Sequence, residues 1–352
     1  MNQKVINAIH IYLLLIISTG FIVHVISIPM LLTVSKRDAW ISVIFSALPF
    51  ILWILFVFYI YKKLNNNIHS FLNMKFSLPI SIVYGIYFLT NAFITLKFTL
   101  IWTKTTYTFE VPNFVVVLVF TLICLYASIK GIRTISTITF LVLPFVILFG
   151  LLVGIGNLPN KDFEQLFPIF ENGYKDTFQG LLYACAGLFE ITYLLFLTPF
   201  IKDQLKLKWL IVTGFMLVLL ILGPLVGAIT EFGPVEAGKM RNPAYEQWRI
   251  LAIGHATRLD FLSIFQWLSG AFVRISLSLF IAGNQFFSNK KRGWVLPIFS
   301  LLLMIAVCIP WDATSFFYFL KRIYYPISLL FQICTLLLFL LLIHFKGDKH
   351  AK

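Results

Sequence analysis

The stretch ACAGLFEITYLLFLTPF, residues 184–200, contains one carboxylate, Glu190, within a run of side chains apolar enough to cross a lipid bilayer. On insertion scales, a charge at the centre of a spanning helix costs about 2.5–3.5 kcal/mol. Charged residues in such segments almost always face the interior of a helix bundle and pair with another polar group. The stretch therefore predicts a membrane protein made of packed helices with a polar centre at Glu190.

The composition of the whole chain also indicates a membrane protein. Of its 352 residues, 60% are hydrophobic and 12% are charged, whereas a soluble domain has about 25% charged residues. The mean hydropathy is +0.91. The net charge of +14 does not indicate nucleic-acid binding, because the basic residues lie between apolar runs, where they set the topology of a membrane protein.

The cysteines and histidines indicate no metal site, no cofactor and no enzyme. All four cysteines lie in apolar segments: Cys124, Cys185, Cys308 and Cys334. This placement argues against a disulfide framework and against a zinc site. The chain has no HExxH pattern, and neither His24 nor His255 has a suitable partner for metal binding or nucleophilic catalysis nearby. The first apolar run lacks a small-residue cleavage site, so we expect it to remain as a span.

Ten apolar runs are long enough to cross about 30 Å of hydrocarbon. They cover residues 11–32, 39–61, 79–103, 111–129, 134–156, 178–201, 209–231, 261–286, 293–311 and 323–345. We therefore expect an all-α membrane protein with ten transmembrane helices, in which residues 1–352 form one permease-like domain.

The basic residues predict how this domain is oriented. An even number of spans places both termini on the same side of the membrane. That side would hold 15 Lys and Arg and only two acidic residues, while the other side would hold 12 Lys and Arg and 11 acidic residues. Because short cytoplasmic loops are enriched in Lys and Arg, we expect both termini to be cytoplasmic.

An acidic connection at residues 157–177 divides the ten spans into five and five. A duplicated unit with an odd number of spans inserts the second time in the inverted orientation, as in many secondary transporters. We therefore expect an inverted repeat, with repeat 1 over about 9–156 and repeat 2 over about 178–345. Spans 1 and 6 share a pattern, since Gly20 lies nine residues before Pro29 and Glu190 lies nine residues before Pro199.

Gly and Pro at corresponding positions indicate broken helices that form a binding site, although packing alone also explains such residues in ordinary spans. We expect breaks in helices 1 and 6, the latter near 186–189. The freed backbone groups and Glu190 would then offer partners for both poles of a zwitterionic amino acid.

Arg274 is the only other unequivocal charge near the middle of a span, in FLSIFQWLSGAFVRISLSLF, residues 261–280. Its depth matches that of Glu190, and a guanidinium and a carboxylate form a bidentate pair. We therefore predict that Glu190 and Arg274 are partners. Two interpretations remain open, because a buried pair either holds helices together or belongs to a ligand site. Arg274 also places a fixed positive charge where some carriers hold sodium, which argues against sodium coupling.

The candidate ligand-binding residues are the small, polar or charged residues near the middle of spans 1, 3, 6 and 8, with the neighbouring phenylalanines. They are Thr19, Gly20, Phe21, His24, Asn91, Ala186, Gly187, Phe189, Glu190, Arg274 and Ser278. Tyr87 and Thr90 of span 3 are further candidates to line the cavity, whereas Lys97 is expected to extend toward the outer face. The segment 232–260 is expected to contain an amphipathic helix, either as a cap over the outer vestibule or as an interfacial loop helix.

Three segments carry a family resemblance: RDAWISVIFSALPF (37–50), GLFEITYLLFLTPFI (187–201) and PAYEQWRILAIGHATRLDFLSIFQWLSGAFVRISLSLF (243–280). They resemble the B-subunit permeases of endospore germinant receptors, which belong to the amino acid–polyamine–organocation (APC) superfamily. The resemblance covers essentially the whole chain. It implies an APC/LeuT-like fold and the sensing of a nutrient, usually an amino acid, in the spore inner membrane. It also implies two partners, an A-type membrane subunit and a C-type lipoprotein.

The chain departs from the family pattern in spans 1 and 6. Ile22 and His24 stand where the family has glycines, and Gly187 is displaced by one position relative to Glu190. These differences predict a site that is narrower or shaped for a different ligand, because glycine permits close backbone approach. A sensor on a transporter fold is the leading interpretation, and a proton-coupled, sodium-independent amino acid transporter is the alternative.

Overall fold

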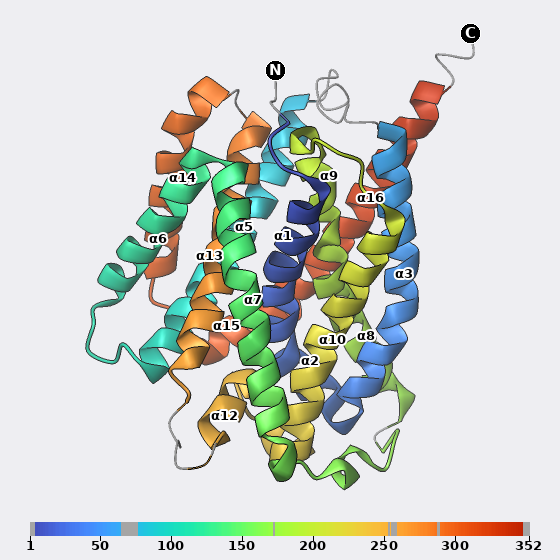
Figure 1. Cartoon of the computed structure of the whole chain (residues 1–352), viewed down its shortest axis with the longest axis vertical. Helices are drawn as coiled ribbons and strands as arrows, with labels where there is room; N and C mark the ends of the chain where they lie inside the picture. The colour runs from blue at the N-terminus through green and yellow to red at the C-terminus, as the bar shows by residue number, and fades with distance from the viewer. Residues whose placement is uncertain are drawn as a thin grey trace.

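The computed structural model describes residues 4–64, 77–171, 173–252, 254, 259–286 and 289–347, so His255 lies outside the described residues. Within these ranges the chain forms an all-helical bundle (Figure 1). Helices predominate because a chain in lipid must satisfy its backbone hydrogen bonds internally. The single β-bridge in the described part joins Ile6 to Ile201.

Seven of the described α-helices lie between residues 4 and 188. They are α1 (Ala8–Phe21), α2 (Ser27–Ser35), α3 (Ala39–Leu64), α5 (Ser77–Thr106), α6 (Asn113–Lys130), α7 (Ile132–Gly156) and α8 (Tyr174–Leu188). The chain reverses between α2 and α3 at Lys36, whose φ is 49°. Gly131 allows a sharp turn between α6 and α7, because its φ of 98° is unfavourable for other residues.

Eight further α-helices follow in the described residues, four with 20 residues or more and four with eight or fewer. They are α9 (Tyr193–Leu197), α10 (Leu207–Phe232), α11 (Pro234–Ala237), α12 (Pro243–Ile250), α13 (Leu262–Phe286), α14 (Asn289–Cys308), α15 (Ala313–Phe319) and α16 (Tyr325–Gly347). The expected amphipathic helix of segment 232–260 is α12, where Tyr245 and Trp248 are buried. Burial raises the pKa of the Tyr245 phenol.

Eight helical stretches of the described chain are long and apolar enough to cross a membrane. They are Ala8–Lys63, Pro79–Thr106, Asn113–Lys130, Ile132–Gly156, Tyr174–Phe200, Leu207–Phe232, Leu262–Asn284 and Ala313–His344, with a shorter apolar helix at Trp294–Cys308. The first stretch contains the reversal at Lys36 and so includes two of the predicted spans. The last begins ten residues before the predicted start at 323, because α15 and a π-helical turn precede α16.

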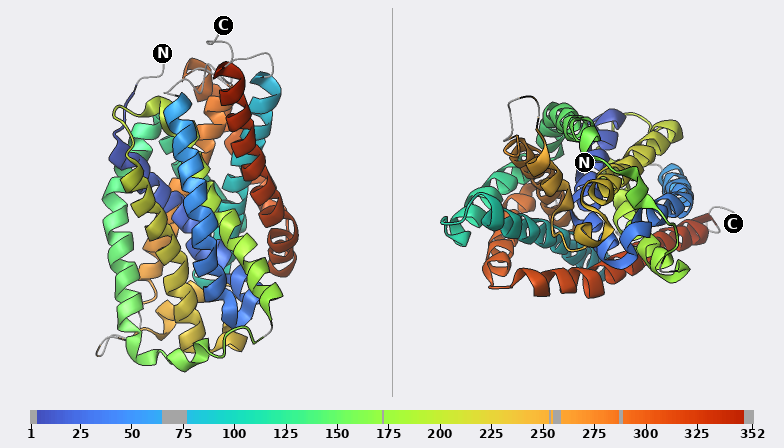
Figure 2. Two further views of the ribbon diagram at one scale, coloured as in Figure 1. Left: turned by 90° about the vertical axis from the view of Figure 1, so that its right-hand side faces the viewer. Right: turned by 90° about the horizontal axis from the view of Figure 1, so that it is seen from below.

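The helices pack in two groups. In the first, α13 lies against α5 and α14 lies against α6; in the second, α3 lies between α8 and α10. α1, drawn in dark blue, runs through the middle and contacts α7, α10 and α13 (Figures 1 and 2). α1 starts and α16 ends at the same end of the bundle.

Lys97 does not extend to the outer face as the sequence suggested. Its side chain is buried, and its Nζ donates to the carbonyl oxygens of Val307 and Ile309, each at 2.9 Å. These carbonyls lie at the C-terminal end of α14, where they have no partner within the helix. Lys97 therefore caps α14 and connects it to α5.

Candidate functional site

The predicted pair of Glu190 and Arg274 is confirmed. Arg274 of α13 donates from Nη1 to Glu190 Oε2 at 2.5 Å and from Nη2 to Glu190 Oε1 at 2.9 Å. Both side chains are fully buried. The contact is bidentate and charge-assisted, which is the strongest geometry for this type of pair. It connects the sixth predicted span to the eighth.

The guanidinium of Arg274 also contacts two other helices. Its Nε donates to Thr95 Oγ1 of α5 at 3.0 Å, and its Nη1 donates to the backbone oxygen of Ser18 in α1 at 3.1 Å. The positive charge is therefore bound by groups from α1, α5 and the Glu190 segment. This arrangement agrees with the prediction of a fixed cation at the middle of the bundle.

A chain of side-chain hydrogen bonds extends from the carboxylate. The Tyr324 hydroxyl lies 2.6 Å from Asn91 Oδ1 and 3.4 Å from Glu190 Oε1. Asn91 Nδ2 donates to the Tyr193 hydroxyl at 2.5 Å. Of these three neutral residues, the sequence argument included only Asn91. The network brings the last span, α15–α16, into the centre of the molecule.

The predicted break in span 6 is a change of helix type rather than an unwound segment. α8 ends at Leu188, and residues Phe189–Thr192 form a 3-10 turn that contains Glu190. The carbonyl of Ala186 accepts a hydrogen bond from Gln332 Nε2 at 3.0 Å. The carbonyl of Phe189 accepts from Trp53 Nε1 at 3.2 Å. Gln332 of α16 and Trp53 of α3 thus bind carbonyl oxygens that were expected from the sequence to bind a ligand.

The predicted break in span 1 is likewise a local change of helix type. Residues Ile22–Ile26 form a π-helical turn between α1 and α2. Ser27 donates from Oγ to the carbonyl of Ile22 at 3.1 Å, and its Oγ lies 2.8 Å from the Tyr325 hydroxyl. Such π-helical turns frequently occur at functional sites. The turn in span 1 is therefore connected directly to α16.

Gly187 permits close contact between spans 1 and 6. A Cβ atom at this position would lie 2.9 Å from Ser27 Oγ and 2.9 Å from Val23 Cγ1, closer than side chains tolerate. Ala186 precedes it in the buried last turn of α8. Gly187 therefore allows spans 1 and 6 to pack more closely than a larger residue would permit.

Several predicted site residues contact groups other than the ion pair. Gly20 faces α10, where an added Cβ would lie 3.1 Å from Leu220 Cδ1, and His24 Nδ1 lies 3.0 Å from the Leu220 carbonyl oxygen. Phe189 stacks on Trp53 with ring centroids 4.0 Å apart. Phe21 packs against Gly270, one turn before Arg274.

The remaining two predicted residues lie in the helices that hold Arg274. Thr19 follows Ser18 in α1, and its buried Oγ1 has no hydrogen-bond partner among the described residues. Ser278 lies one turn after Arg274 in α13 and is fully buried. Spacing in the sequence did not determine which face of its helix each of these side chains would occupy.

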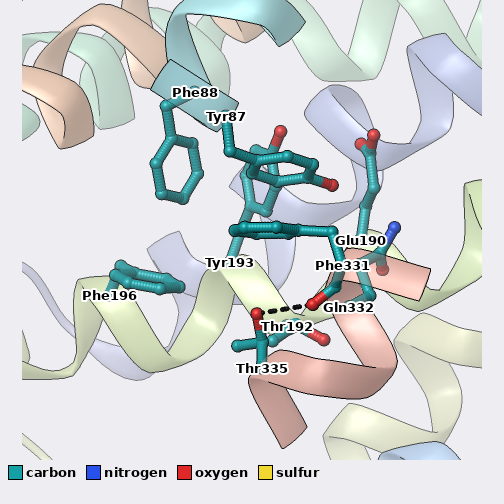
Figure 3. A pocket seen from close by; sticks show the side chains of 9 residues that line it. All are labelled: Tyr87, Phe88, Glu190, Thr192, Tyr193, Phe196, Phe331, Gln332 and Thr335. Carbon is teal, nitrogen blue, oxygen red and sulfur yellow. Dashed lines mark hydrogen bonds between the residues drawn. The ribbon is translucent and has the colours of Figure 1, made fainter. Parts of the chain in front are cut away.

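A small cavity adjoins Glu190 on the side of α5 and α16 (Figure 3). Its volume is ≈ 10 Å³, about enough for one water molecule. It is lined by Tyr87, Phe88, Glu190, Thr192, Tyr193, Phe196, Phe331, Gln332 and Thr335. Of the predicted residues, Glu190 and the further cavity candidate Tyr87 lie on its wall. A nutrient molecule larger than water requires these side chains to move.

Tyr324, Tyr325 and Gln332 contribute much of the polar centre and were not among the residues predicted from the sequence. Tyr324 ends a second π-helical turn, Leu320–Tyr324, and α16 follows it directly. The available signal was the pair of tyrosines before Pro326, together with an amide one-third of the way into an apolar span. Because that span was judged only by its length and charge, these groups were not selected.

The sequence of this chain is similar to a known protein family and to one of the proteins described for it. The family model of spore germination proteins matches residues 8–316. The chain is also similar to Spore germination protein XB of Bacillus anthracis, with 38% identity over 331 residues. That alignment covers 92% of this chain and 93% of the relative.

Proposed function

This chain belongs to the family of spore germination proteins, and from this premise we propose that it is the nutrient-sensing B subunit of a germinant receptor. The protein is a germinant receptor-related membrane protein with several apolar helices. We place it in the inner membrane of the spore with an A-type membrane subunit and a C-type lipoprotein as partners. The relative in Bacillus anthracis, itself described as a spore germination protein, supports the assignment to germination.

The proposed architecture has ten spans in two inverted repeats of five. The packing supports it, since α5 lies on α13, α6 lies on α14 and α3 lies on α10. These pairs correspond to spans 3 and 8, 4 and 9, and 2 and 7. Helices related by a two-fold axis contact each other when they lie beside that axis. The two spans with altered helix type, 1 and 6, are also counterparts in this scheme.

The ion pair of Glu190 and Arg274 carries the functional proposal. Two full charges are enclosed at mid-depth, and they are bound by α1, α5 and α13 together with the tyrosine network. In a zwitterionic amino acid, the carboxylate would pair with Arg274 and the ammonium group would pair with Glu190. Its binding would separate the two side chains and move Tyr324, so the ligand would favour one of two helix arrangements. Partner subunits would then respond to the change in α16.

The experiment measures germination of spores that carry variants of this chain against a panel of nutrients. For Glu190→Gln we expect at least roughly a tenfold rise in the nutrient concentration required, equivalent to about 1.4 kcal/mol. Glu236→Gln is the matched control, since Glu236 lies exposed in α11. An unchanged response of Glu190→Gln spores to every effective nutrient would contradict the proposed site. His24→Gly would report whether the altered span 1 determines which nutrient is effective.

A proton-coupled amino acid transporter, independent of sodium, is the second candidate. The contact of Arg274 Nη1 with the Ser18 carbonyl favours sodium independence, because a fixed cation already occupies a backbone oxygen of α1. Uptake of labelled amino acids by proteoliposomes that contain this chain alone separates the two functions. Robust uptake without partner subunits would support transport, whereas binding without uptake would support sensing.

A further inference from the structure

An apolar groove runs between α5 and α16, separate from the ion pair. Its volume is ≈ 270 Å³, larger than the roughly 150 Å³ of an apolar cavity that stays dry and binds benzene. The lining residues are Pro79, Ile80, Val83, Tyr84, Phe331, Cys334, Thr335 and Leu338. The groove therefore has the size and composition of a binding site for a hydrocarbon.

The groove lies in one leaflet of the proposed membrane. Its α5 residues precede Asn91 by 7 to 12 positions, and its α16 residues follow Tyr324 by 7 to 14 positions. At 1.5 Å per residue, this places the groove roughly 10–20 Å from the level of the ion pair. The direction is toward the end of the bundle where α1 starts and α16 ends (Figure 1). The groove therefore spans the depth of lipid tails in that leaflet.

The surroundings of the groove are lipid-facing. Val83 is 52% exposed on its wall, and the neighbouring Ile82, Ile86 and Leu337 also point outward. All eight lining residues come from α5 and α16. The groove is thus continuous with the apolar outer surface of the bundle.

The groove wall exposes almost no polar surface to water. Thr335 donates from Oγ1 to the carbonyl of Phe331 at 2.8 Å. Tyr84 is buried, and its ring packs against Phe196 and Phe331. Water is stable in a cavity only with two or more polar partners, and an empty groove would lose van der Waals contacts along its wall. The hydrocarbon of a bilayer lipid needs no polar partner, and it restores the van der Waals contacts along the wall.

We propose that this groove binds one acyl chain of a bilayer lipid, from the leaflet on the side of the chain termini. The chain would lie against Phe331, whose ring stacks on Tyr87 with centroids 4.0 Å apart. Phe331 and Thr335 also line the small cavity beside Glu190 (Figure 3). The bound chain therefore supports the wall that separates the polar centre from the membrane.

The test uses the full chain in liposomes that contain a phosphatidylcholine with a photoreactive diazirine in one acyl chain. After irradiation, peptides from 79–84 and 331–338 should carry roughly tenfold more lipid adduct than peptides from the outer face of α6, equivalent to about 1.4 kcal/mol. Val83→Phe fills the groove and should remove the excess. Val119→Phe is the matched control, because Val119 is 53% exposed on α6 and lines no part of the groove.

A second measurement uses the native chain and does not depend on the folding of a variant. Cys334 is an exposed thiol on the groove wall. Its alkylation by a membrane-soluble maleimide should be slow in lipid-containing detergent and about tenfold faster after delipidation, with recovery of the slow rate when phospholipid is added back. Equal amounts of lipid adduct on all lipid-facing helices would overturn the proposal. An alkylation rate of Cys334 that is the same with and without phospholipid would also overturn it.

Discussion

Glu190 and Arg274 are each fully buried, so each depends on the other for compensation of its charge. Arg274→Gln leaves a buried carboxylate with the Tyr324 hydroxyl as its remaining near contact. Removal of one partner of a buried pair costs about 3–5 kcal/mol. We expect this loss in the free energy of unfolding in detergent, and a smaller loss for the double variant Glu190→Gln/Arg274→Gln than for the sum of the two single variants.

The control is an exposed pair of the same charge type. Lys239 and Glu236 lie 2.7 Å apart with both side chains exposed, and neutralising Lys239 should cost below about 1 kcal/mol. Strict additivity of the Glu190 and Arg274 variants would contradict a direct coupling between them.

The ion pair could be predicted from the sequence because a charge within an apolar run is visible without any knowledge of packing. Tyr324 could not be selected in the same way. The chain has 14 tyrosines, and most of them are compatible with a membrane interface or an apolar core. Which one reaches Asn91 and Glu190 depends on the π-helical turn before α16, and this turn has no marker in the composition of the segment.

The 3-10 turn Phe189–Thr192 is bound by one side chain of α3. Trp53 donates from Nε1 to the Phe189 carbonyl and to Thr192 Oγ1, at 3.2 and 3.0 Å. Trp53→Phe keeps much of the stacking on Phe189 but removes both contacts. We expect a loss of about 1–3 kcal/mol in the free energy of unfolding, since buried acceptors lose a donor.

The same substitution on the outer surface supplies the control. Trp294 is largely exposed, so Trp294→Phe should change the free energy of unfolding by at most about 0.5 kcal/mol. A Trp53→Phe protein as stable as the Trp294→Phe protein would show that the 3-10 turn does not need its indole donor.

The ten predicted ranges lie mostly on helix, although 111–129 begins before α6 and 293–311 ends after α14. Length and hydropathy are enough to locate most of these helices. The helix type within spans 1 and 6 could not be predicted from length and hydropathy. Gly20 and Pro29 correctly marked a special segment, yet the segment becomes a π-helical turn because Ser27 bonds back to Ile22. That bond joins residues five apart, a spacing that composition does not reveal. Side-chain caps from Trp53 and Gln332 likewise come from distant helices.

The orientation of the whole molecule in the membrane can be predicted from its charge and from the position of the helix ends. α1 starts and α16 ends at one end of the bundle (Figures 1 and 2). The connections at that end contain basic residues such as Lys130, Arg133, Lys202 and Lys206, whereas the opposite end carries Glu110 and Glu236. Because positively charged loops remain in the cytoplasm, the end with Lys130 and Lys202 should face the cytoplasm.

Single cysteines in a chain whose four native cysteines are replaced by alanine test this orientation. Exposed positions at the two ends are Glu110 and Val235 on one side and Lys130 and Lys202 on the other. An impermeant maleimide added to intact cells should react at 110 and 235 and leave 130 and 202 unmodified. All four should react after detergent treatment, which controls for accessibility. The reverse pattern in intact cells would invert the membrane orientation and place the proposed acyl-chain groove in the opposite leaflet.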